Sequence, residues 1–148
     1  MMRVKCLAAF VLIVFMSALR AEVVDIGGEE ALRLQAAGVP VIDVRTANEW
    51  RETGVIAGSH LLTFFDEQSR VDQPAWLARL APIAGPQQAV VVICRSGKRS
   101  QAVSDFLSQQ AGYATVYNVR GGILAWNREG RALAPMGPLA ACPAGSRC

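Results

Sequence analysis

The sequence predicts an α/β fold, with a central parallel sheet of about five strands flanked by helices on both faces. Two observations lead to this prediction. Segments with strand-like patterns take turns with segments whose apolar residues recur at helical spacing. One strand segment, residues 89–93, is an alanine followed by valines and an isoleucine, which is typical of a strand buried on both faces. Strand–helix alternation favours a parallel sheet joined by right-handed crossovers.

The first half of the domain contains three predicted strands and two predicted helices. Gly38 marks the end of the first helix, because glycine readily takes the left-handed conformation that follows many helices. Gly54 turns the chain after the second helix. The predicted elements are strand 22–26, helix 28–37, strand 40–45, helix 47–52 and strand 60–64.

The second half continues the alternation with two strands and three helices. Pro74 suits the first turn of a helix, where its missing N–H costs nothing. Ser100 is a candidate N-cap, because its hydroxyl can accept a hydrogen bond from a free amide of the first turn. The predicted elements are helix 74–80, strand 89–94, helix 100–111, strand 113–119 and helix 123–129.

The first 21 residues have the pattern of a secretory signal peptide. Basic residues precede an apolar run from Leu7 to Leu19, and Ala21 offers a small residue at a cleavage site. We therefore expect export to the periplasm, a domain over residues 22–130 and a tail over 131–148. An uncleaved N-terminal anchor is the alternative. If the segment is cleaved, we expect the protein to contact a membrane only through this segment, during export.

Charge gives no indication of nucleic-acid binding. The chain has 15 basic and 12 acidic residues, and the signal segment carries three of the basic ones and no acidic one. The mature part therefore has 12 of each and no net charge, so its basic residues matter only where they cluster. Past the signal, Cys142 and Cys148 either pair as a disulfide that leaves Cys94 free, or stay unpaired in a flexible tail. No metal site is expected from two tail cysteines.

The most distinctive stretch is residues 94–100, with the sequence CRSGKRS. It follows the buried strand and leads into a helix, the location where ligands bind in open α/β sheets. Loop amides, the helix N-terminus and the cations Arg95, Lys98 and Arg99 would all favour a thiolate at Cys94. The alternative is a buried, inert cysteine followed by solvated charges.

This loop resembles the active-site loop of single-domain rhodaneses, which are thiosulfate sulfurtransferases, most closely the small periplasmic type. Three further segments resemble the family in the family's order. They are residues 41–45 (VIDVR) followed by Glu49 and Trp50, residues 54–60 (GVIAGSH), and residues 113–126 with Gly121 and Gly122. The histidine of the family's turn is Val55 here, and the only histidine of the chain is His60.

The resemblance implies a double displacement through a persulfide on Cys94. A small anionic sulfur donor such as thiosulfate supplies the sulfur, a thiol or cyanide accepts it, and no cofactor is needed. The resemblance also implies substrate contacts by the rest of the loop: Arg95, Ser96, Gly97, Lys98, Arg99 and Ser100. Related phosphatases and arsenate reductases place five residues between cysteine and arginine, whereas four separate Cys94 from Arg99. The shorter loop suits a single sulfur atom.

Other residues and other functions stay open at this point. Asp43 and Arg45 end a strand on the side of the loop, where they either orient it through a polar network or form a structural ion pair. His60 is either a supporting polar group or a structural one. A small cysteine phosphatase or arsenate reductase, a persulfide carrier and a binding module are the alternative functions.

Overall fold

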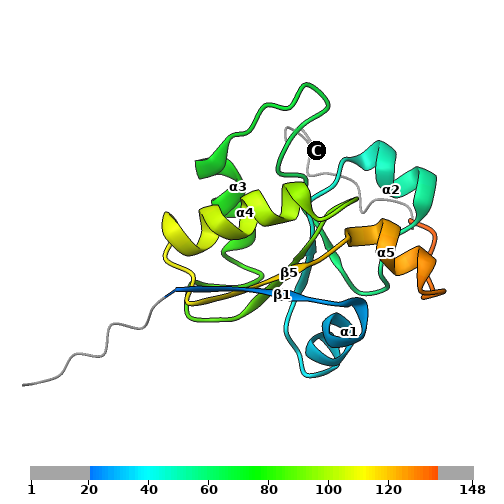
Figure 1. Ribbon diagram of the computed structural model, residues 1–148. Helices are drawn as coiled ribbons and strands as arrows, with labels where there is room; N and C mark the ends of the chain where they lie inside the picture. Colours follow the sequence, from blue (N-terminus) through cyan, green and yellow to red (C-terminus); the bar gives the residue numbers. More distant parts are fainter. Residues whose placement is uncertain (1–20, 137–148) are drawn as a thin grey trace, which may run out of the picture.

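The computed structural model describes residues 21–136 and contains one five-stranded sheet with five helices (Figure 1). All strand pairs are parallel, and the strand order is β1-β5-β4-β2-β3. The predicted α/β fold with a parallel sheet is therefore confirmed. The strands are β1 (Glu22–Ile26), β2 (Val41–Asp43), β3 (His60–Leu61), β4 (Val90–Ile93) and β5 (Thr115–Val119).

Helices cover both faces of this sheet, as predicted. In Figure 1, α3 and α4 lie on one side of the sheet, and α1 lies on the other. The side chains of β4 alternate between the two faces, so Val92 and Cys94 pack on the α3 and α4 side and Val91 on the α1 and α5 side. The helices are α1 (Gly28–Ala36), α2 (Ala47–Thr53), α3 (Gln73–Leu80), α4 (Lys98–Gln109) and α5 (Gly122–Arg128).

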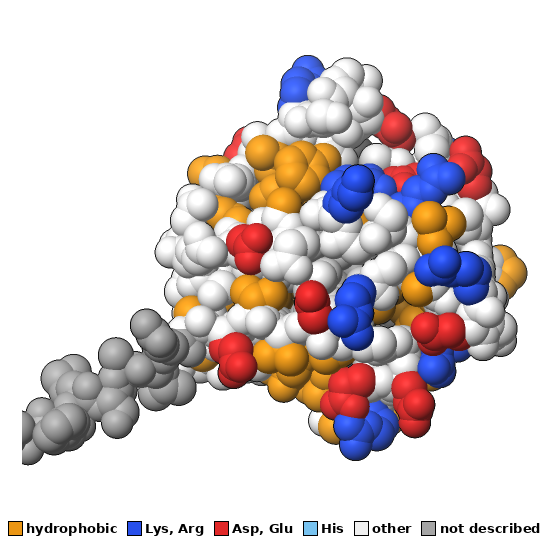
Figure 2. Space-filling view, viewed as in Figure 1, with side chains coloured by type: hydrophobic (Ala, Val, Ile, Leu, Met, Phe, Trp, Pro, Cys, Tyr) orange, Lys and Arg blue, Asp and Glu red, His pale blue; other side chains and the backbone are white. Residues whose placement is uncertain are grey.

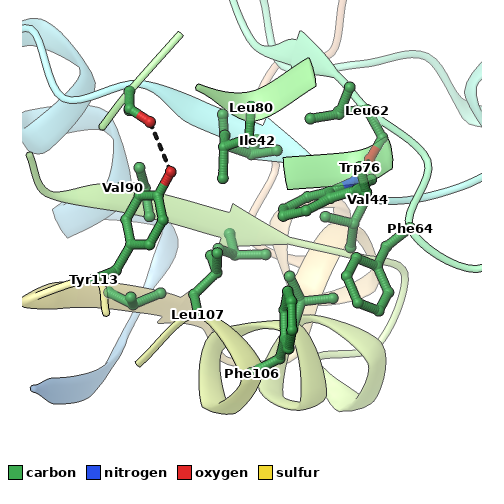
Figure 3. Close-up of a cluster of buried hydrophobic side chains, with 14 of the residues drawn as sticks. Ile42, Val44, Leu62, Phe64, Trp76, Leu80, Val90, Phe106, Leu107 and Tyr113 are labelled. Atoms are coloured by element: carbon green, nitrogen blue, oxygen red, sulfur yellow. Dashed lines mark hydrogen bonds between the residues drawn. The ribbon is translucent and has the colours of Figure 1, made fainter. Parts of the chain in front are cut away.

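The core between the sheet and α3 and α4 is rich in aromatic side chains (Figure 3). The ring centroid of Phe64 lies 4.9 Å from that of Trp76 and 5.6 Å from that of Phe106. The buried Tyr113 donates its hydroxyl hydrogen to the carbonyl of Ala84 at 2.7 Å, the bond dashed in Figure 3. Burial raises the pKa of this phenol. This core supports β4 and α4, and with them the loop that joins them.

The start of α4 differs from the prediction. The N-cap is Gly97, with φ of +92°, and the helix begins at Lys98, so Ser100 lies inside the first turn and is not the cap. A left-handed residue turns the chain from β4 into the helix within a short loop, and glycine takes that conformation without a Cβ clash. The helix therefore starts two residues before the predicted start at residue 100, and its N-cap lies three residues before Ser100.

Residues 131–134, which follow the domain boundary expected at residue 130, pack back on the domain. Val55 and Ala134 exchange backbone hydrogen bonds of 2.9 and 2.8 Å, and the Trp126 Nε1 donates to the Ala132 carbonyl. The predicted signal segment, apart from Ala21, and both tail cysteines, Cys142 and Cys148, lie outside the described residues. Within residues 21–136, no helix has the length and apolar character needed to cross a membrane.

Candidate active site

The loop between β4 and α4 holds the thiol of Cys94 in its interior. Cys94 directly follows β4, and none of its surface is exposed. The backbone N–H of Gly97 donates to the Cys94 Sγ, with the nitrogen 3.2 Å from the sulfur. A donor aimed at the sulfur stabilises negative charge there, because a charged acceptor strengthens a hydrogen bond. The loop therefore aims a backbone donor at the sulfur, at the position that the sequence indicates.

The N-terminus of α5 fixes the other side of this loop. The Ile123 N–H donates to the carbonyl of Cys94 at 2.9 Å, and the Leu124 N–H donates to the carbonyl of Arg95 at 3.0 Å. These two bonds require a very close approach at Gly122. A Cβ on Gly122 would lie 2.3 Å from the Cys94 carbonyl oxygen, far inside van der Waals contact.

A buried polar network lies beneath the loop. The Ser100 hydroxyl contacts the Gly97 carbonyl oxygen at 3.2 Å and the Asn118 Oδ1 at 2.7 Å. The Asn118 amide donates to the Asp25 carboxylate at 2.7 Å and to the Gln101 side-chain oxygen at 2.9 Å. Ser100 is fully buried, and its hydroxyl faces Asn118 of β5. Its contact with a substrate stays a prediction. Asn118 is not among the predicted site residues. The only sign of its role in the sequence is that a polar residue occurs within a buried strand.

The last cation of the loop is paired with a carboxylate of α2. The Arg99 guanidinium donates to both oxygens of Glu49, at 2.8 and 2.5 Å. Glu49 is itself held by the capping box of α2, in which the Thr46 N–H donates to its carboxylate. Arg99 is predicted to bind substrate. In the structure, two of its guanidinium nitrogens donate to Glu49, and this ion pair ties the loop to α2.

The ion pair shifts both partners toward their charged forms. Burial opposes ionisation of Glu49 most strongly, but hydrogen bonds from Arg99 and from the Thr46 N–H outweigh it, and the pKa of Glu49 lies below its ordinary value. The hydrogen bond to Glu49 is the main reason that the pKa of Arg99 is raised, and the charge of the Cys94 thiolate adds to it. Arg99 therefore lies within electrostatic reach of the sulfur.

The remaining side chains of the loop are exposed. Ser96 and Lys98 line a hollow on the β1 and β5 side, whereas Arg95 lines a crevice against α2 and α5. In Figure 2, basic side chains gather toward the right of the view, where Figure 1 places α2 and α5. The two exposed cations of the loop, Arg95 and Lys98, thus line two different hollows.

Asp43 and Arg45 form a fully buried ion pair beside the loop. The Arg45 guanidinium donates to both carboxylate oxygens of Asp43, and also to the Thr53 hydroxyl and the Gly54 carbonyl. These bonds join the end of β2 to the end of α2. The direct contacts therefore fit the structural ion pair. The connection to residues 94–100 is indirect, through Thr53 and Glu49 to Arg99.

His60 begins the edge strand β3 and is exposed, opposite Ile42 in the strand register. Within residues 21–136, no hydrogen bond of its side chain is present, and no group of three or more His, Cys, Asp or Glu side chains is placed to hold a metal ion.

Known proteins match this chain over most of the residues that the structure describes. The family model described as "Rhodanese-like domain" matches residues 28–129. Thiosulfate sulfurtransferase 18 of Arabidopsis thaliana is 32% identical over 111 residues, which is 71% of this chain and 79% of that protein. Thiosulfate sulfurtransferase GlpE of Pseudomonas entomophila is 31% identical over 68% of this chain and 82% of its own length.

The solved structures include a rhodanese-related protein from Thermoplasma volcanium that superposes with a TM-score of 0.56. It is 30% identical, and the match covers 75% of this chain and 97% of that one.

Proposed function

The chain belongs to the rhodanese-like domain family, and from that premise we propose that it is a thiosulfate sulfurtransferase that carries sulfur on Cys94. Two of the relatives that match most of its length are themselves named thiosulfate sulfurtransferases. The observation that carries the proposal is the position of the Cys94 sulfur, buried inside a short loop, 3.2 Å from the Gly97 amide nitrogen.

In the first half-reaction, the Cys94 thiolate attacks the outer sulfur of thiosulfate. A new S–S bond forms, the S–S bond of thiosulfate breaks, and sulfite leaves with the electron pair. The Gly97 N–H, already aimed at Sγ, stabilises charge on sulfur in the manner of an oxyanion hole. The exposed cations Arg95 and Lys98 attract the dianionic donor.

In the second half-reaction, cyanide or a thiolate attacks the outer sulfur of the persulfide. The persulfide S–S bond breaks, and its electron pair returns to Cys94 as the thiolate. Because Cys94 is fully buried, both partners reach the sulfur only after a local rearrangement of its surroundings. The loop length supports sulfur chemistry over phosphoryl transfer, since four residues between Cys94 and Arg99 enclose less space than five.

A turnover assay tests this proposal. Purified protein incubated with thiosulfate and cyanide should form thiocyanate, and Cys94→Ser should form none. Thiocyanate from the variant at the wild-type rate, or hydrolysis of an aryl phosphate in place of sulfur transfer, would reject the proposal. One stoichiometric transfer per Cys94, without turnover, would instead identify a persulfide carrier.

Export to the periplasm is part of the same proposal and is supported by the signal pattern of residues 1–21. Expression of the full chain in a Gram-negative host, fractionation and intact-mass measurement test it. A periplasmic product that has lost residues 1–21 is expected. A full-length product that fractionates with the membrane would indicate an uncleaved anchor.

A further inference from the structure

A hollow adjoins the active-site loop on the side away from Glu49. It lies at the carboxyl ends of β1 and β5, next to the first turn of α4. The residues that define it are Asp25, Ser96, Gly97, Lys98, Asn118 and Arg120. Gly97 belongs both to this hollow and to the surroundings of the thiol, because its N–H donates to the Cys94 Sγ. A single residue, Gly97, therefore lies between this hollow and the buried sulfur.

The floor of the hollow is fixed by hydrogen bonds. Asn118 is 3% exposed, and its side chain bonds to Ser100, Gln101 and Asp25. A buried amide with all its partners present has little freedom to move. The hollow is therefore formed before any ligand arrives, and ligand binding does not have to order it.

The rim of the hollow carries charges of both signs. Lys98 and Arg120 are exposed, and neither has a carboxylate within 4 Å among residues 21–136. Asp25 is also exposed, and one of its oxygens accepts from Asn118. Two cations without partners suit a carboxylate, and a carboxylate with one oxygen engaged suits an ammonium group. An α-amino acid head group offers both.

We infer that this hollow binds the α-amino acid head group of the thiol that accepts sulfur from Cys94. The inference rests on the proposed function and names the chemical class of its acceptor. The acceptor thiolate attacks the outer sulfur of the persulfide, an S–S bond forms to the acceptor, and the bond to Cys94 breaks with return of the thiolate. Lys98 and Arg120 hold the acceptor's carboxylate, and Asp25 holds its ammonium group, while the thiol faces the loop.

Four acceptors of similar size separate the contributions of the two charges. L-Cysteine has both groups, 3-mercaptopropionate only the carboxylate, 2-mercaptoethylamine only the ammonium group, and 2-mercaptoethanol neither. The acceptor KM is measured from sulfite release at saturating thiosulfate. Arg120→Gln should raise the KM only for the two thiols with a carboxylate, L-cysteine and 3-mercaptopropionate. The expected increase is about 3- to 10-fold, which corresponds to the loss of an exposed charged contact. Asp25→Asn should raise the KM by a similar factor only for the two thiols with an ammonium group, L-cysteine and 2-mercaptoethylamine.

Arg79→Gln is the matched control, because it removes one exposed positive charge on α3 outside the hollow and should change no acceptor KM. Equal effects of Arg120→Gln on all four thiols, or no effect on any, would overturn the inference. A raised KM of Arg120→Gln for thiosulfate, measured with cyanide as acceptor, would overturn it by assigning Arg120 to the donor. Failure of the wild-type protein to transfer sulfur even to cyanide would reject the proposed function itself.

Discussion

Gly122→Ala is the sharpest test of how the active-site loop is held. Gly122 has φ of +56°, and an alanine there costs about 1–2 kcal/mol for the left-handed backbone. Its Cβ would also lie 2.3 Å from the Cys94 carbonyl oxygen and 2.7 Å from the Arg95 carbonyl group. These are backbone atoms, which cannot rotate away, and overpacking of this kind costs about 1–3 kcal/mol more. We expect a total destabilisation of about 2–5 kcal/mol.

Gly112→Ala is the matched control for the backbone cost. Gly112 has a similar φ of +74°, but a Cβ there meets nothing within 4 Å. This variant should lose only about 1–2 kcal/mol for the left-handed conformation, and it should keep the reactivity of Cys94. Urea unfolding of both variants at the same pH gives the two free-energy changes.

The alkylation rate of Cys94 provides the second measurement. Relief of the contact at Gly122 must move the Cys94 and Arg95 carbonyls, which disturbs the Gly97 N–H bond to the sulfur. We expect the iodoacetamide rate at Cys94 to change in Gly122→Ala while the protein is still folded. Equal destabilisation of the two variants, with unchanged alkylation in both, would refute the close-approach explanation.

Two further substitutions address the supports of the loop. Glu49→Gln should lower the free energy of unfolding by about 0.5–1 kcal/mol at neutral pH, since its ion pair with Arg99 is only partly exposed. The pKa of Glu49 is lowered in the folded state. The stabilisation by the ion pair is therefore fully present above about pH 4.3 and is lost as the pH falls through the pKa of Glu49 in the folded protein. A difference in stability between wild type and variant that persists in strong acid would contradict this explanation. Ser100→Ala leaves the Asn118 Oδ1 without a donor and should cost about 1–2 kcal/mol. Ser100→Ala should also slow thiocyanate formation, because the Gly97 carbonyl loses its contact with the Ser100 hydroxyl. Unchanged stability of the variant in urea unfolding would contradict a stabilising role of the Ser100–Asn118 network.

The order of the elements and the position of the reactive thiol could be predicted from the sequence, because they depend on local patterns. The apolar run 89–93 predicts β4. In a parallel sheet, a cysteine that follows this strand lies at the carboxyl-terminal end of the sheet, so its position follows from the topology alone. Paired glycines are typical of close backbone approach, and Gly122 makes one here, since a Cβ on it would meet the Cys94 carbonyl oxygen.

Contacts between distant segments could not be predicted in the same way. Arg99 has a charge that suits a substrate anion, but its partner Glu49 lies 50 residues earlier and meets it only in the folded chain. Ser100 has the residue type of an N-cap, yet the left-handed Gly97 ends the loop sooner and places Ser100 over Asn118. In both cases a tertiary contact decides the role of a residue whose type allows several.

The most direct test of the central claim is the intact mass of the protein after reaction with thiosulfate and removal of excess reagent. The wild-type protein should gain the mass of one sulfur atom, localised to Cys94 by peptide mapping, and should lose it on addition of cyanide. Cys94→Ser, which keeps the other three cysteines of the chain, should gain nothing. A wild-type protein without added sulfur, or a variant that gains it equally, would contradict the persulfide on Cys94.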